Sequence, residues 1–186
     1  DLNQVLDWVE TTYSTHPNIN LLKINLVGHS RGGGIATLKA AEDSRVKTLV
    51  SLAGVSDFDS RFPKGADLEV WKSTGVHFVM NGRTKQQMPH YYQFYEDFVA
   101  NASRLTIQTA AKKLKQPHLI IHGDTDTSVG LEEAFALHQW NPESELIVLE
   151  GANHVFGSHH PWGFSELPPY LQQIHSKITQ FINNLP

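Results

Sequence analysis

The sequence predicts an α/β fold in which a parallel sheet is flanked by helices. Short apolar runs alternate with amphipathic helical segments along the chain, and these runs lack the strict apolar–polar alternation of a solvent-facing sheet. The chain has 186 residues, of which 40% are hydrophobic and 18% are charged. This length and composition fit a single domain, residues 1–186, with a substantial buried core.

Four apolar runs are the candidate strands, and each is rich in Val, Leu and Ile. They are residues 21–28, 46–55, 118–123 and 144–152. One helical segment begins near residue 2, and the others are residues 32–43, 129–140 and 168–185. Strands that alternate with helices form parallel pairs through crossover connections, so we expect about four parallel strands covered on both faces.

One segment, residues 56–116, interrupts this alternation between the second and third strands. It contains an Asn81-Gly82 turn signal, followed by five closely spaced aromatic residues: Tyr91, Tyr92, Phe94, Tyr95 and Phe98. It can be an insertion with its own small aromatic core, a cap that forms one wall of a pocket, or both.

Charge and composition exclude several functional classes. The chain has 15 Lys+Arg and 19 Asp+Glu, a net charge of −4, which offers no basic surface for nucleic acid or anionic membranes. It has no cysteine, which removes disulfides, thiolate metal sites and cysteine nucleophiles. No apolar run approaches the ~18 residues of a membrane span, so we expect no membrane-spanning segment. Because cysteine is absent and no signal peptide is visible, we expect a cytoplasmic protein.

The main chemical motif is Gly28-His29-Ser30-Arg31-Gly32, which follows a strand and opens a helix. A G-x-S-x-G motif in this context is a nucleophile elbow, a tight turn that lifts the serine hydroxyl above the sheet edge. The flanking glycines are expected to leave room for the turn. A glycine-rich phosphate-binding turn is the alternative, but the established nucleotide motifs are absent.

A base and an acid follow in the order that this motif requires. Asp124 and Asp126 follow the third strand, and His154 follows the fourth. All lie just beyond the carboxyl ends of predicted parallel strands, where open α/β sheets build their sites. Two alternatives remain for the acid, Asp124 and the earlier Asp57. His154 could also join His159 and His160 in a metal cluster, although no acidic or cysteine partner stands beside them.

The segments GHSRGG, HGDTDTSV and GANHVF resemble the α/β-hydrolase superfamily. The similarity is greatest to its dienelactone-hydrolase and small carboxylesterase branches, with prolyl-oligopeptidase-type domains as more distant relatives. The resemblance implies a serine esterase with Ser30 as nucleophile, His154 as base and Asp126 as acid, acting without cofactor or metal on a small-molecule acyl substrate. The backbone N–H of Arg31 would donate to the oxyanion, while its side chain is expected in a surface or interdomain ion pair. His29 is expected to pack beside the site, and His122 to hydrogen-bond locally.

The chain departs from the family pattern in its number of strands. The first strands of the family sheet, and the loop that supplies the second oxyanion donor, have no counterpart in the sequence. We therefore expect a fragment, or one part of a nicked assembly, that associates with a missing N-terminal half. Two other functions remain open: a non-catalytic module with this fold, and a serine peptidase of the prolyl-oligopeptidase type.

Overall fold

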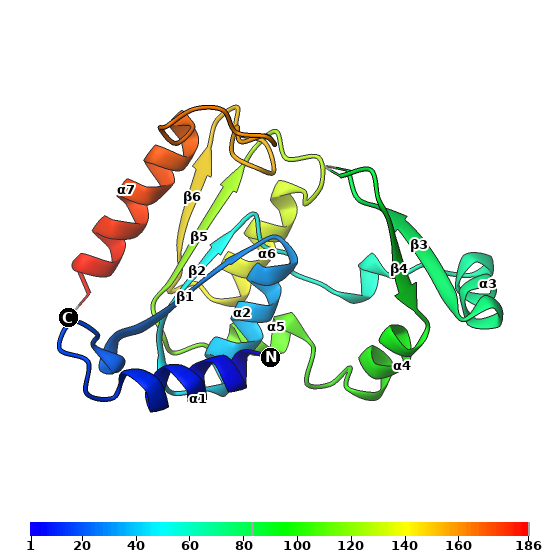
Figure 1. Ribbon diagram of the computed structural model, residues 1–186, viewed down its shortest axis with the longest axis horizontal. Helices are drawn as coiled ribbons and strands as arrows, with labels where there is room; N and C mark the ends of the chain where they lie inside the picture. The colour runs from blue at the N-terminus through cyan, green and yellow to red at the C-terminus, as the bar shows by residue number, and fades with distance from the viewer. Residues whose placement is uncertain (83, 186) are drawn as a thin grey trace.

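The computed structural model describes residues 1–82 and 84–185, so Arg83 of the 56–116 segment and the last residue, Pro186, lie outside the described part. Its main sheet has four parallel strands in the order β1-β2-β5-β6 (Figure 1). The strands are β1 (Ile24–His29), β2 (Val46–Leu52), β5 (His118–Gly123) and β6 (Glu145–Leu149). The expected parallel α/β sheet is confirmed.

The first strand begins later than predicted, because Leu21–Lys23 forms a short 3₁₀ helix, η1. The side chain of Asn20 accepts a hydrogen bond from the N–H of Leu22 at 2.9 Å and so caps this turn. Such a local side-chain bond competes with the strand ladder, and apolar periodicity gives no sign of it.

Helices cover both faces of the sheet, as the alternation of buried side chains along β5 requires. Ile120 packs with α2 (Arg31–Glu42), α5 (Ile107–Lys113) and α6 (Leu131–Trp140), whereas Leu119 and Ile121 pack on the other face with α7 (Pro169–Asn183). Successive strand residues point to opposite faces, so two apolar layers form around one strand. The longest helix, α7, has 15 residues, and no helix in the described part has the length and apolarity to cross a bilayer.

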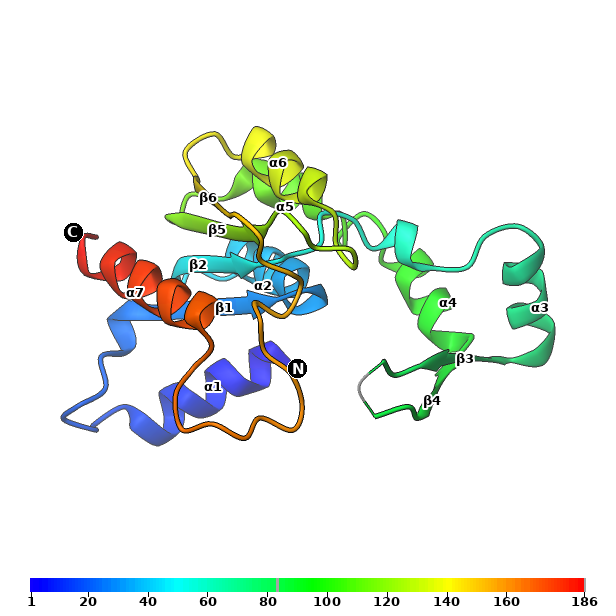
Figure 2. The same cartoon turned by 90° about the horizontal axis from the view of Figure 1, so that it is seen from above.

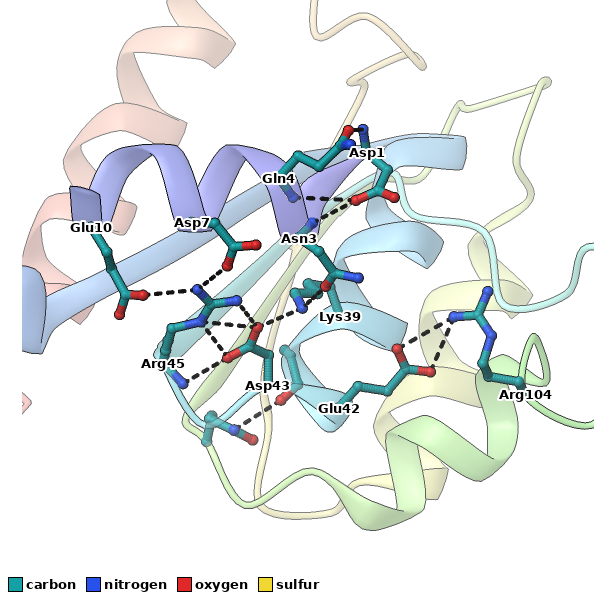
Figure 3. A network of polar contacts seen from close by, with 12 residues as sticks. Asp1, Asn3, Gln4, Asp7, Glu10, Lys39, Glu42, Asp43, Arg45 and Arg104 are labelled. Carbon is teal, nitrogen blue, oxygen red and sulfur yellow. Dashed lines mark hydrogen bonds and ion pairs between the residues drawn. The ribbon is translucent and has the colours of Figure 1, made fainter. Parts of the chain in front are cut away.

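Helix α1 (Leu2–Tyr13) lies beside α2 and is held there by one buried side chain and a charge network. Leu6 packs against α2 and β2, and Arg45 binds Asp43, Asp7 and Glu10 at 2.7 to 2.9 Å (Figure 3). The hydrogen bonds from the Arg45 guanidinium hold the pKa of Asp43 well below its usual range. This network joins the first helix to the connection between α2 and β2.

The insert lies to one side of the sheet (Figures 1 and 2). It consists of η2 (Asp59–Arg61), α3 (Ala66–Thr74), the antiparallel hairpin of β3 (Val76–Met80) with β4 (Gln87–Tyr91), and α4 (Gln93–Ala100). Trp71 is buried in it, stacks on Phe62 and donates its indole N–H to the His90 carbonyl at 2.8 Å. The last helix of the 56–116 segment, α5, packs instead with α2 in the core.

Candidate active site

Ser30 lies at the junction of β1 and α2 in a backbone conformation that L-residues rarely adopt, with φ 58° and ψ −125°. Its N–H donates to the carbonyl of Leu52 at 2.9 Å. Its carbonyl accepts from the N–H groups of Gly33 at 2.9 Å and Val55 at 3.2 Å. These three bonds, made by the N–H and the carbonyl of Ser30, offset the backbone strain and fix the direction of the serine side chain.

Two glycines make this turn possible, but they are not quite the expected pair. A Cβ on Gly28 would overlap the carbonyl oxygen of Gly32, and a Cβ on Gly33 would lie 2.8 Å from the Cα of Gly54. A Cβ on Gly32 would meet nothing within 4 Å. Close approach therefore requires Gly28 and Gly33, and the expectation that Gly32 makes room through its missing side chain is wrong.

His154 lies in the loop after β6, and its imidazole joins Ser30 to Asp126. Nε2 is 3.0 Å from the Ser30 Oγ, and Nδ1 is 2.7 Å from the Asp126 Oδ2. A carboxylate only accepts hydrogen bonds, so Nδ1 carries the proton and Nε2 is free to accept one from the hydroxyl. The three residues singled out from the sequence thus form one hydrogen-bonded series.

The Asp126 carboxylate is held by the turn that follows β5. Its Oδ1 accepts from the N–H groups of Ser128 at 2.8 Å and Val129 at 2.9 Å, and its side chain is fully buried. Burial alone would raise the pKa of Asp126, but the hydrogen bonds from Val129, His154 and Ser128 outweigh it and lower the pKa below its ordinary value. The acid is therefore ionised at neutral pH and can orient a neutral imidazole and stabilise its cation.

The other candidate acids have different contacts. Asp124 accepts the N–H of Gly151 at 2.7 Å and joins the turn after β5 to the turn after β6. Asp57 accepts the N–H groups of Asp59 and Ser60, the first two residues of η2. Among the described residues, Asp126 is the carboxylate that contacts His154.

Two of the other histidines singled out from the sequence have contacts away from the His154 imidazole. The Nε2 of His122 lies 2.8 Å from the Val129 carbonyl, while the ring of His159 packs on Trp162 with centroids 4.9 Å apart. No group of three or more potential metal ligands is found in the described part of the chain.

Backbone hydrogen bonds beyond the strand ends connect the elements that carry the site. The N–H of Ala53, just after β2, donates to Ile121 of β5 at 2.9 Å. The N–H of Asp124 donates to Leu149 at 3.3 Å, and that of Thr125 to Ala152 at 3.2 Å. Together with the bond from Ser30 to Leu52, they run across the sheet edge from the serine to the loop that carries His154.

A cavity of about 610 Å³ lies among α1, α2 and α4, and Arg31, the residue after Ser30, is one of its lining residues, whereas Ser30 itself is not. Its walls are largely apolar, and the insert contributes Phe62, Phe94 and Phe98. The Arg31 guanidinium lies over the Phe94 ring, 5.8 Å from its centroid, and the expected ion pair is not found among the described residues. Nothing in the local sequence indicated this contact, because Arg31 and Phe94 lie 63 positions apart along the chain.

Comparisons with known proteins find a matching family and a similar protein. Residues 1–162 match the sequence model of the prolyl oligopeptidase family. The uncharacterized peptidase YtmA of Bacillus subtilis (strain 168) is 28% identical over 170 residues, which are 91% of this chain and 58% of that protein. The chain therefore spans less than two thirds of the length of this relative.

Solved structures with similar folds include Est1E and an acylaminoacyl peptidase. Est1E from Butyrivibrio proteoclasticus has a TM-score of 0.63 at 19% identity and is covered over 68% of its chain, against 98% of this one. The Pyrococcus horikoshii acylaminoacyl peptidase has a TM-score of 0.63 at 16% identity, with 98% of this chain and 27% of that one covered. The expected α/β-hydrolase fold is confirmed.

Proposed function

This chain belongs to the prolyl oligopeptidase family, and from that premise we propose that it carries the catalytic residues of a serine hydrolase. The substrate is a small carboxylic ester or related acyl compound. The observation that carries the proposal is the His154 imidazole, which lies 3.0 Å from the Ser30 hydroxyl and 2.7 Å from the Asp126 carboxylate. Serine, imidazole and carboxylate in this order are the requirements for nucleophilic acyl transfer.

In the acylation step, Ser30 Oγ attacks the carbonyl carbon of the substrate while its proton passes to Nε2 of His154. The carbonyl oxygen becomes an oxyanion, which accepts a hydrogen bond from the backbone N–H of Arg31. That N–H is at the first position of α2, where a helix leaves N–H groups without intrahelical acceptors and carries a partial positive charge. The bond to the leaving group then breaks, and His154 returns the proton to the departing oxygen or nitrogen.

In the deacylation step, water attacks the acyl-enzyme and gives its proton to the same Nε2. The ester bond to Ser30 breaks, and His154 returns the proton to the serine oxygen. Asp126 stays ionised throughout. It holds the proton of the imidazole on Nδ1 and stabilises the imidazolium that forms in both steps.

A fluorophosphonate probe tests the proposal directly, because it phosphonylates an activated serine. We expect labelling of the natural-length protein at Ser30, complete loss of labelling in Ser30→Ala, and slow labelling in His154→Ala. A matched control is Ser158→Ala, whose hydroxyl bonds to a carbonyl in the same loop as the base. Absence of labelling at Ser30 would favour the alternative of a non-catalytic module.

Cleavage of peptide bonds is the second candidate, favoured by the family itself and by the relative that is named a peptidase. The same residues serve both reactions, and the difference lies in the leaving group, an alcohol in one and a poorer amine in the other. Paired p-nitrophenyl esters and p-nitroanilides with the same acyl group separate the two. We expect the ester series to be cleaved and to vary with acyl length, since the cavity beside Arg31 has largely apolar walls.

A further inference from the structure

His29, the residue before the proposed nucleophile, makes a contact that the mechanism above does not use. Its Nε2 lies 2.8 Å from the backbone carbonyl oxygen of His154, 125 residues further along the chain. The two imidazole rings lie 4.8 Å apart, and the His29 ring also lies 6.1 Å from the ring of Phe156. The strand that carries the serine is thus bound to the backbone of the base itself.

This contact matters because the base comes from the far side of the sheet. Ser30 follows β1, whereas His154 follows β6, and the order β1-β2-β5-β6 places these strands at opposite edges. Most polar contacts of the His154 loop are with the turn after β5. The Thr125 Oγ donates to Ala152 at 2.9 Å, and the acid itself binds the imidazole.

On the serine side, the described residues provide two polar contacts to the base. One joins the His154 Nε2 to Ser30 Oγ, and the other joins His29 to the His154 carbonyl. The first cannot survive the reaction, because Ser30 Oγ has no proton to donate once it is acylated. The second uses no reacting atom, so the reaction itself does not break it.

We propose that His29 is a positioning residue that holds the His154 backbone over β1, above all while Ser30 is acylated. The inference rests on the proposed function, since it assigns a role within the same reaction. His154 accepts this bond through a carbonyl, so His29 must carry its proton on Nε2. In the acyl-enzyme, this bond keeps the imidazole above the ester carbon, where it can activate water.

Two substitutions separate the hydrogen bond from the ring. His29→Phe keeps an aromatic ring against Phe156 and removes the donor, whereas His29→Gln keeps an N–H at a similar distance from the backbone and removes the ring. His175→Phe, an exposed histidine on α7, is the control for the exchange itself. The natural-length protein is mixed with a p-nitrophenyl ester in stopped flow, so that the burst gives the acylation rate and the steady phase gives the deacylation rate.

We expect His29→Phe to slow deacylation about tenfold and acylation less than about threefold, in line with the loss of one hydrogen bond. The value of KM then falls together with kcat, and the burst becomes more distinct. His29→Gln should restore deacylation to within about threefold, and His175→Phe should change neither rate. A general loss of structure would instead lower both rates and the amount of labelled Ser30.

The inference is overturned if His29→Phe keeps its deacylation rate, or if His29→Gln loses as much as His29→Phe. In either case normal fluorophosphonate labelling at Ser30 leaves the proposed function intact. If the unchanged protein is not labelled at all, the proposed function fails and this role fails with it. Should His29→Phe not fold, the comparison of His29→Gln with the unchanged protein still tests the donor, since slowed deacylation there would contradict the proposal.

Discussion

Replacing Asp126 by Asn changes one atom of the proposed acid and reverses the proton on the base. The new amide side chain keeps an oxygen for the N–H groups of Ser128 and Val129, which now bind Oδ1 at 2.8 and 2.9 Å. Its NH₂ group then faces Nδ1 of His154, which lies 2.7 Å from the Asp126 Oδ2 in the unchanged protein, and donates to it. The imidazole proton must move to Nε2, where it points at Ser30 and blocks transfer from the hydroxyl.

The magnitude follows from this change of tautomer. A neutral amide also gives no stabilisation to the imidazolium, so both functions of the acid are lost together. We expect kcat for a p-nitrophenyl ester to fall about 10⁴-fold, which corresponds to about 5 kcal/mol of transition-state stabilisation. The turn keeps both of its backbone bonds, so the melting temperature should change little.

Asp124→Asn is the matched control, because it makes the same chemical change two residues away. Asp124 accepts the N–H of Gly151 at 2.7 Å, and an amide oxygen can accept the same bond. We expect kcat in this variant to stay within about threefold of the unchanged protein. The reasoning is refuted if Asp124→Asn loses as much activity as Asp126→Asn, or if Asp126→Asn keeps more than about a tenth of the original kcat.

Three further predictions concern stability. Gly33→Ala should lower the free energy of unfolding in urea by about 2 kcal/mol or more, because its Cβ would lie 2.8 Å from the backbone of Gly54. Gly32→Ala should leave this free energy unchanged or raise it slightly, because a Cβ there meets nothing within 4 Å. Burial lowers the pKa of His118 from 6.5 to about 3. Between these two pH values the imidazole is protonated in the unfolded chain and neutral in the native protein. The free energy of unfolding should therefore decrease as pH falls from 6.5 towards 3, by at most ~1.4 kcal/mol per pH unit. In urea unfolding measured across this pH range, His118→Gln should remove this contribution to the pH dependence. Trp71→Ala should lower the stability of the insert by about 3 kcal/mol, because this side chain is buried within it. Amide hydrogen exchange should then become faster in β3 and β4 but not in β5.

The sequence was sufficient for the fold class and for the meeting of Ser30, His154 and Asp126, because both depend on strand order along the chain. Each residue follows a continuous apolar run, and the carboxyl ends of parallel strands share one edge of the sheet. The choice of Asp126 over Asp124 was open on spacing alone and came from the family motif. The structure gives it a physical basis, since the turn N–H groups of Ser128 and Val129 hold Asp126 towards the base.

The contacts that could not be predicted depend on packing between distant segments or on a single local bond. His29 binds the His154 loop, and Arg31 lies over Phe94 of the insert, although neither partner is near in sequence. Asn20 shortens the first strand through one side-chain hydrogen bond. No periodicity encodes such contacts, because each depends on where another segment comes to rest.

The site is best understood as a property of the sheet edge rather than of three separate loops. Four backbone bonds join Ser30 to Leu52, Ala53 to Ile121, Asp124 to Leu149 and Thr125 to Ala152, so each strand end is fixed to its neighbour. These bonds fix the backbone positions of the serine and the acid at the sheet edge. The bond to Ala152, however, is made two residues before His154. The base therefore depends on side-chain contacts for its final position, from Asp126 on one side and His29 on the other. It follows that substitutions at these two contacts should impair turnover more than folding, whereas proline substitutions that remove an N–H donor of the strand-end bonds should impair both.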